Sequence, residues 1–120
     1  DGRSHPRSAG TYARILGHYV REEKSLSLME ALRKMSLAPA QRLEKRTPAM
    51  RGKGRIRVGA DADIAVFDPN RVTDRATYRQ PGLHSEGIQY VLVNGVPVVM
   101  EGRLQEGINP GRAVRAVIQP

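Results

Sequence analysis

The stretch YVLVNGVPVVM, residues 90–100, carries the strongest local signal in this chain of 120 residues. Two runs rich in β-branched residues flank Asn94-Gly95, the pair that a two-residue type I′ hairpin turn favours because both positions need a positive φ. Pro97 has no N–H to donate to a sheet, which predicts an edge or bulge position. Glu101-Gly102 predicts another turn, and Arg103-Leu104 begins a further short strand. This part of the chain therefore predicts antiparallel β-structure.

The stretch GRIRVGADADIAVFDP, residues 54–69, extends this prediction upstream. Ile56 and Val58 alternate with arginines, which is the pattern of a half-buried strand. Gly59 indicates a turn, and residues 64–67 form a second apolar run with the length of a strand. Beyond the hairpin, the tail from Arg112 onward predicts either a final strand or a short helix.

Three aspartates of this stretch invite a choice between metal binding and turn formation. Asp61 and Asp63 have the spacing of the first ligands of a calcium loop, but the other ligands of such a loop are missing. We interpret both as turn residues whose carboxylates bond backbone N–H groups beside the Gly59 turn. The same interpretation applies to Asp68, which precedes Pro69.

Residues 11–44 predict helices. Thr11 is a suitable N-cap, and an apolar stripe with a helical period follows it, made of Tyr12, Ile15, Leu16, Tyr19 and Val20. Ser27 and Glu30 have the spacing of a capping box at the start of a second helix, which continues through Leu28, Leu32 and Met35. Pro39 predicts an interruption at the residue before it, followed by a third short helix. Helices followed by antiparallel strands predict an α+β fold.

Composition limits the function classes. The chain has no Cys, which excludes a disulfide scaffold, a Cys-based zinc site and a Cys nucleophile. No apolar run approaches the ~18 residues of a membrane span, and we expect a cytoplasmic protein without a membrane partner.

The net charge of +8 raises the question of a nucleic-acid partner. Basic residues are spread along the chain, and their densest stretch, residues 45–57, has no aromatic side chains to stack on bases. We therefore favour a solvated basic surface over a nucleic-acid groove.

The chain offers few residues for catalysis. His18 lies off the apolar stripe of the first predicted helix and His84 lies in a polar loop, so we interpret both as ordinary surface histidines rather than metal ligands. The opening stretch DGRSHPR, residues 1–7, places an acid, a His and an Arg in a loop before a helix, where functional residues often lie. It begins at Asp1 without Met, so we expect either a trimmed end or a piece of a longer protein.

Four segments in order resemble the C-terminal portion of N-acyl-D-amino-acid deacylases (D-aminoacylases) of the amidohydrolase superfamily. They are DG…HPRSAGTYARILGHYVRE, LSLMEALRKMSLAPAQRL, GRIRVGADADIAVFDP, and EGIQYVLVNGVPVVMEGR with the following PGR. The third segment is similar to a signature shared widely in the superfamily, and the first and fourth point to the D-aminoacylase branch. Residues 44–54 depart from the family, which commonly has Gly after Pro-Ala-x-x-Leu.

The resemblance implies a place in a larger fold. The family fold is a metal-bearing (β/α)8 barrel with a small β-sandwich domain, and active-site residues lie on loops after the barrel strands. Residues 1–50 would form the last active-site loop and the closing helices of the barrel. Residues 51–120 would form the C-terminal strands of the small β-domain.

The resemblance also implies a chemistry. Asp1 matches the family's acid after the last barrel strand, where a carboxylate exchanges protons with water and the leaving amine beside zinc. Asp1 is thus the predicted catalytic residue and the only position here that the metal would reach. Arg7 either binds a substrate carboxylate or, with His5, braces the loop.

The resemblance leads us to expect an N-acyl-D-amino acid as substrate of the parent enzyme. The metal ligands of the family lie upstream, so this chain alone should bind no zinc and hydrolyse no amide without the missing barrel segment. The alternative is an autonomous basic α+β module that binds nucleic acid or protein without catalysis. A fragment would expose its apolar helix stripes, which predicts either self-association or disorder before about residue 25.

Overall fold

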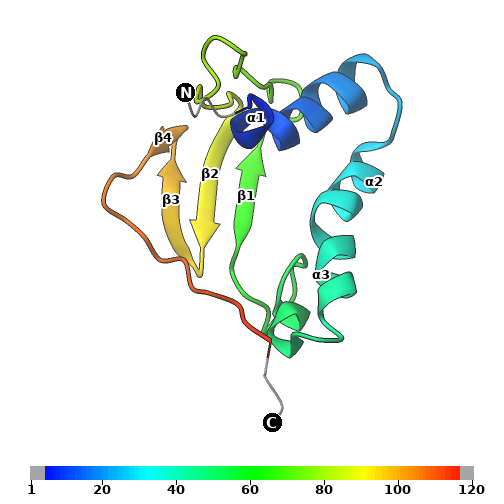
Figure 1. Ribbon diagram of the computed structural model, residues 1–120, viewed down its shortest axis with the longest axis vertical. Helices are drawn as coiled ribbons and strands as arrows, with labels where there is room; N and C mark the ends of the chain where they lie inside the picture. The colour runs from blue at the N-terminus through cyan, green and yellow to red at the C-terminus, as the bar shows by residue number, and fades with distance from the viewer. Residues whose placement is uncertain (1–4, 117–120) are drawn as a thin grey trace.

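The computed structural model describes residues 5–116 and has an α+β fold, as the sequence predicts. Helices α2 and α3 run along one side of a four-stranded sheet, and α1 lies over the end where β1 ends and β2 begins (Figure 1). No helix of the described part has the length and apolar character to cross a bilayer.

The first helix begins earlier than the sequence predicts. Helix α1 spans Arg7–Arg14 and continues as the π-helical segment η1, Ile15–Glu22. Thr11 is therefore not the N-cap; its hydroxyl donates to the carbonyl of Arg7 at 2.6 Å, one turn back inside the helix. Pro6 occupies the N-cap position with φ −51° and provides no side-chain cap.

The second helix begins at the predicted cap but is not interrupted where expected. Ser27 Oγ accepts the N–H of Glu30 at 3.2 Å, although the Glu30 carboxylate pairs with Lys34 instead of completing a capping box. The helical segments that follow run without a break: α2 Leu28–Leu32, the π-helical η2 Arg33–Leu37, and α3 Ala38–Leu43.

The predicted third short helix is present as α3, with Pro39 near its start, but the prediction that Pro39 interrupts the helix is wrong for a local reason. The N–H of Ala38 bonds to the carbonyl of Arg33, five residues back, which is a widened π-type turn. A regular α-helical interior has no room for the Pro39 ring, which also lacks an N–H to donate. The wider turn accommodates the ring. A short 3₁₀ segment, η3 Pro48–Gly52, then leads to the strands.

The sheet has the order β1-β2-β3-β4, and each neighbouring pair is antiparallel. The strands are β1 Ile64–Phe67, β2 Ile88–Val93, β3 Val96–Met100 and β4 Arg103–Leu104. Asn94 (φ 49°) and Gly95 (φ 77°) form the predicted hairpin turn between the paired Val93 and Val96. Glu101 (φ 51°) and Gly102 (φ 75°) form the next turn in the same way.

Pro97 lies beside a β-bulge, one of the two positions that its missing N–H predicts. It pairs with Leu92, whereas the neighbouring Val91 pairs with Val99, so Val98 is an extra residue in β3. The ladder thus accommodates a proline within β3, a strand with neighbours on both sides.

The predicted strand at Ile56 and Val58 does not form. Their side chains are 86% and 104% exposed, and the carbonyl of Arg57 bonds to the N–H of Ala60 in a turn that includes Gly59 (φ 81°). Alternation predicts which residues share a face but not whether a partner strand is present, and within residues 5–116 none pairs with this stretch.

The core lies where the helices meet the loop after β1. Its buried residues are Ala13, Leu16, Ala31 and Val72. Half-buried side chains from both halves of the chain pack around them: Ile15, Val20, Leu26, Leu28, Leu32, Met35, Phe67 and Ile88. The apolar helix stripes are therefore partly covered within the chain, against the expectation that they stay exposed.

Gly17 allows this packing. A Cβ at this position would lie 2.7 Å from the carbonyl oxygen of Val72, which is closer than real contacts permit. The glycine weakens the helix locally, but it lets the backbone of the loop after β1 approach the helix directly.

Candidate functional site

The catalytic residue that the sequence predicts, Asp1, lies outside the described residues. The other predicted site residue, Arg7, is the first residue of α1 and has an exposed side chain. Arg7 lines a cleft of about 530 Å³ between the beginning of α1 and residues 74–78. The other lining residues are His5, Pro6, Gly10, Thr11, Arg14, Ile15, Tyr19, Asp74, Ala76, Thr77 and Tyr78.

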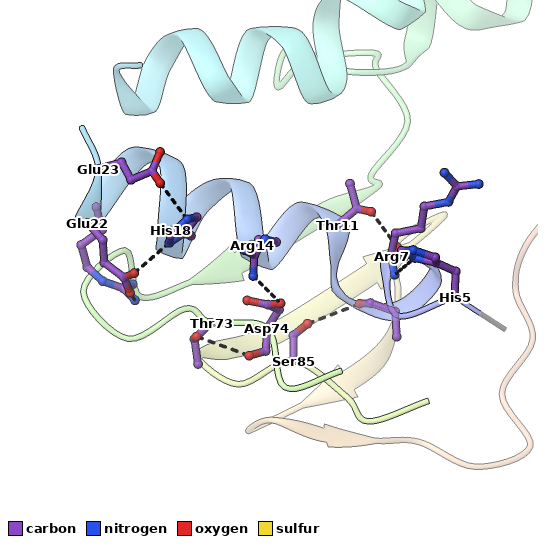
Figure 2. A network of polar contacts seen from close by, with 12 residues as sticks. His5, Arg7, Thr11, Arg14, His18, Glu22, Glu23, Thr73, Asp74 and Ser85 are labelled. Atoms are coloured by element: carbon purple, nitrogen blue, oxygen red, sulfur yellow. Dashed lines mark hydrogen bonds and ion pairs between the residues drawn. The ribbon is translucent and has the colours of Figure 1, made fainter. Parts of the chain in front are cut away.

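His5 connects the two walls of this cleft, the first residue of α1 and Tyr78. Its Nδ1 accepts the backbone N–H of Arg7 at 3.1 Å (Figure 2), and its Nε2 lies 3.2 Å from the hydroxyl of Tyr78. Because a backbone N–H can only donate, Nδ1 is the acceptor and the proton of the neutral ring lies on Nε2. The two rings also meet edge to face, with centroids 5.2 Å apart.

Two more contacts hold α1 against the strand half of the chain, the part that follows the start of β1. Arg14 forms an ion pair with Asp74 at 3.5 Å, and Ser85 Oγ donates to the carbonyl of Ala9 at 3.4 Å (Figure 2). Hydrogen bonding to Tyr19, followed by the charge of Asp74, raises the pKa of Arg14. At Gly10 a Cβ would lie only 3.0 Å from the Cβ of Asp74, so the helix backbone lies close to this loop.

The Arg7 side chain extends away from these contacts (Figure 2). Its backbone is held on both sides, since its N–H donates to His5 and its carbonyl accepts the Thr11 hydroxyl. No carboxylate among residues 5–116 forms an ion pair with its guanidinium. The backbone is thus positioned by its neighbours, and the guanidinium is available to an anion.

Sequence reasoning missed Tyr78 and Asp74. Tyr78 lies 73 residues from His5, which it contacts just before α1, and Asp74 is similarly distant in sequence from Arg14 of α1. The stretch that contains them has neither a helical nor a strand period, so no local pattern relates them to α1.

His18 has acidic neighbours on both sides of its ring. Nδ1 lies 3.1 Å from Glu22 and Nε2 lies 2.9 Å from Glu23, both on the same helix end (Figure 2). The hydrogen bond from His18 is the main cause that lowers the pKa of Glu22. Within residues 5–116 no three His or acidic side chains come together as a metal site. His84 is exposed in its loop.

Asp61 and Asp63 face a lysine. Lys53 Nζ lies 2.6 Å from Asp63 Oδ2 and 3.2 Å from Asp61 Oδ2, while Asp63 Oδ1 accepts the N–H of Asn94 at 2.8 Å. The Asn94 N–H, with Lys53, lowers the pKa of Asp63, and Asp63 raises the pKa of Lys53. Asp63 therefore does bond a backbone N–H, but at the hairpin turn and not at Gly59.

Asp68 forms the turn that the sequence predicts, since its Oδ1 accepts the N–H of Asn70 at 2.9 Å. Two cations of the basic stretch at residues 45–57 are paired within the chain: Lys53 with the two aspartates, and Arg55 with Glu44 at 2.8 Å. These pairs reduce the positive charge that this stretch offers to a nucleic acid.

Comparison with known proteins assigns this fold to a family. The model of the Amidohydrolase family matches residues 3–99, which is most of the chain. The chain belongs to the amidohydrolase family. The match includes the first turns of α1, the loop at residues 74–78 and nearly all of the hairpin.

Curated relatives in this family are deacylases of N-acyl-D-amino acids. The chain is 44% identical over 115 residues to the N-acyl-D-glutamate deacylase of Alcaligenes xylosoxydans xylosoxydans, covering 96% of this chain and 22% of that enzyme. It is 42% identical over 101 residues to the D-aminoacylase of the same organism, covering 84% of this chain and 20% of that enzyme.

Solved amidohydrolases share the fold. The N-acyl-D-glutamate deacylase of Bordetella bronchiseptica, crystallised with zinc and a phosphonate that mimics the tetrahedral intermediate, matches with a TM-score of 0.79 at 41% identity over 97% of this chain and 23% of its own. A D-aminoacylase studied for its binuclear metal centre matches with a TM-score of 0.78 at 36% identity, over 88% of this chain and 21% of its own.

This amidohydrolase chain spans about a fifth of the length of these relatives. It corresponds to one region of a deacylase, and its described residues hold no metal-ligand cluster of their own.

Proposed function

We propose that this chain is the closing segment of a zinc-dependent amidohydrolase that hydrolyses N-acyl-D-amino acids to a carboxylate and a D-amino acid. The observation that carries the proposal is the match over 97% of the chain to a deacylase crystallised with zinc and an intermediate mimic. Residues 1–50 contribute the last active-site loop and the closing helices, and residues 51–120 contribute strands of a small β-domain.

Residues 5–116 do not fit zinc, because no group of three His or acidic side chains among them is arranged to hold a metal ion. Under this proposal the metal rests on residues outside that range, with Asp1 as the one position of this chain within its reach. The 120-residue chain by itself is expected to be inactive.

Asp1 acts as the general acid and base. Its carboxylate accepts the proton of the attacking water and then donates it to the nitrogen of the leaving amine. In the sequence Asp1 precedes Arg7, the first residue of α1, by six positions.

Arg7 binds the carboxylate that every N-acyl-amino acid carries. A guanidinium donates two parallel hydrogen bonds to a carboxylate, which orients as well as binds it. The held backbone and outward side chain of Arg7 support this role. The bracing of the loop, the other role considered for Arg7, uses its backbone atoms and leaves the guanidinium available.

A chimera tests the proposal. These 120 residues replace the matching segment of the N-acyl-D-glutamate deacylase to which they are 44% identical. The chimera is expected to release D-glutamate from its N-acyl derivative, whereas the isolated chain with added zinc releases nothing from N-acetyl-D-methionine. In the chimera, Asp1→Asn should lower kcat by about 10²–10⁴-fold.

The matched control is Asp68→Asn, which changes an aspartate that serves only a turn. A folded chimera in which Asp1→Asn retains full activity, or an isolated chain that hydrolyses the amide, would contradict the proposal.

A further inference from the structure

The first turn of α1 is held by a side chain from the strand half of the chain. Pro6 gives α1 no side-chain cap, so the N–H of Arg7 bonds to His5 Nδ1 at 3.1 Å instead. The same ring contacts the Tyr78 hydroxyl through Nε2 at 3.2 Å, across a sequence separation of 73 residues. His5 therefore connects the backbone of Arg7 to Tyr78.

Tyr78 has a defined backbone from which to make this contact. Residues 77–80 form a closed turn, with Thr77 and Gln80 exchanging backbone hydrogen bonds of 3.2 Å in both directions. The Thr77 hydroxyl also accepts the N–H of Gln80 at 3.0 Å. Just before this turn, Asp74 is paired with Arg14 of α1. The loop is thus held at two points: Asp74 pairs with Arg14 of α1, and Tyr78 contacts His5, two residues before Arg7.

The contact sets the orientation of the His5 ring. With the ring proton on Nε2, the ring donates to the Tyr78 hydroxyl and turns its free lone pair on Nδ1 toward the Arg7 N–H. Without the Tyr78 hydroxyl, the exposed ring could turn or take the other tautomer, and either change removes the acceptor from Arg7. The edge-to-face contact of the two rings restricts the same rotation.

We propose that Tyr78 and His5 are positioning residues for Arg7. Together they hold the backbone from which the Arg7 guanidinium extends at the cleft beside residues 74–78. The loop that carries Tyr78 thereby helps to fix the position of the Arg7 backbone, from which the guanidinium extends. The proposal rests on the proposed function only for what Arg7 binds; the positioning is a property of this chain.

Nuclear magnetic resonance of the 120-residue chain tests the positioning directly. The unmodified chain should give His5 nitrogen shifts of the Nε2–H tautomer and a coupling through the hydrogen bond between the Arg7 amide nitrogen and His5 Nδ1. Tyr78→Phe keeps the ring and removes the hydroxyl. It should reduce the Nε2–H population and lower the protection of the Arg7 amide from exchange by about twofold to fivefold.

Two more variants separate positioning from general stability. His5→Ala removes the acceptor and should lower the protection of the Arg7 amide and its backbone order. His5→Asn supplies a side-chain oxygen two residues before the N–H, as in an Asx turn, and should restore both without Tyr78. Tyr12→Phe is the matched control, because Tyr12 is an exposed tyrosine of the same helix, and it should change nothing at Arg7.

The hairpin amides report whether each variant is folded. If Tyr78→Phe leaves the His5 tautomer and the Arg7 amide unchanged in a folded chain, or if His5→Asn fails to rescue His5→Ala, the positioning is wrong. The hydrolysis assay of the chimera is independent of these spectra. A chimera without activity overturns the proposed function, and it leaves the positioning to be decided by the spectra alone.

Discussion

The β2–β3 hairpin and the first turn of α1 are both tight structures, but they are held in different ways. The hairpin turns at Asn94 and Gly95, whose positive φ values suit these residue types, and its strands pair directly on either side. The first turn of α1 receives no side-chain cap from Pro6; the N–H of Arg7 bonds to His5, whose ring contacts Tyr78 across 73 residues. A structure specified by its own residues can be predicted from them, whereas one completed by distant residues requires the tertiary fold.

Among the structures that depend on distant residues, the burial of Val72 should have the largest effect on stability. It is completely buried against Ala13, Leu16 and Ala31 of the helices, although it belongs to a loop that no local pattern distinguishes. Val72→Ala should lower the free energy of unfolding by about 2–3 kcal/mol, through lost burial and the cavity left behind. Chemical denaturation measures this, with Val58→Ala at a fully exposed position as the control that changes little. Equal effects of the two substitutions would show that the loop is not part of the core.

Gly17→Ala places local and tertiary effects in opposition. Helix propensity alone predicts that alanine stabilises by up to about 1 kcal/mol. The added Cβ would lie 2.7 Å from the Val72 carbonyl oxygen, so we expect a net loss of about 2 kcal/mol. Gly82→Ala, where no atom lies within 4 Å of the added Cβ, is the control. A rise in the melting temperature of Gly17→Ala would mean that the helix does not pack on this loop.

Gly95→Ala tests the hairpin turn, which depends on its own residues. The residue has φ 77°, and a Cβ there meets no atom closer than 3.8 Å, so the cost is conformational rather than steric against neighbours. We expect a loss of about 1 kcal/mol with the hairpin register preserved. Denaturation gives the magnitude and cross-strand contacts between Val93 and Val96 give the register. A loss as large as that of Val72→Ala would argue that the turn also depends on distant packing.

The smallest expected effect is a pH dependence at the junction between Lys53 and the hairpin. The Asn94 N–H and Lys53 lower the folded pKa of Asp63 below its ordinary value. The ionised carboxylate therefore contributes stability above the pKa of an unfolded Asp, and this contribution is lost as the pH falls through the lowered folded pKa. Melting temperatures between pH 6 and pH 2 should fall less steeply for Asp63→Asn.

The matched control for this pH series is Glu106→Gln, an exposed acid on the same half of the chain. The melting temperature of this variant should fall between pH 6 and pH 2 as steeply as that of the unmodified chain. If the melting temperature of Asp63→Asn falls with pH as steeply as that of the unmodified chain, this junction makes no contribution.

The sequence by itself determined the features that nearest neighbours decide. The hairpin at Asn94-Gly95, the strand at Ile64–Phe67 and the Ser27 cap depend on φ preferences, apolar runs and a hydroxyl at the right spacing. The resemblance that led to the amidohydrolase family rests on such stretches as well, and the match to residues 3–99 confirms it.

Only the tertiary structure decided what depends on a partner far along the chain. Ile56 and Val58 have the alternation of a strand but find none to pair with among residues 5–116, so they remain exposed. Pro39 stays within a helix because a π-type turn precedes it, and the first N–H of α1 bonds to the His5 ring, which Tyr78 contacts from the loop after β1. Local preferences amount to a fraction of a kcal/mol to about 1 kcal/mol per residue, whereas packing and shared hydrogen bonds outweigh them wherever distant segments meet.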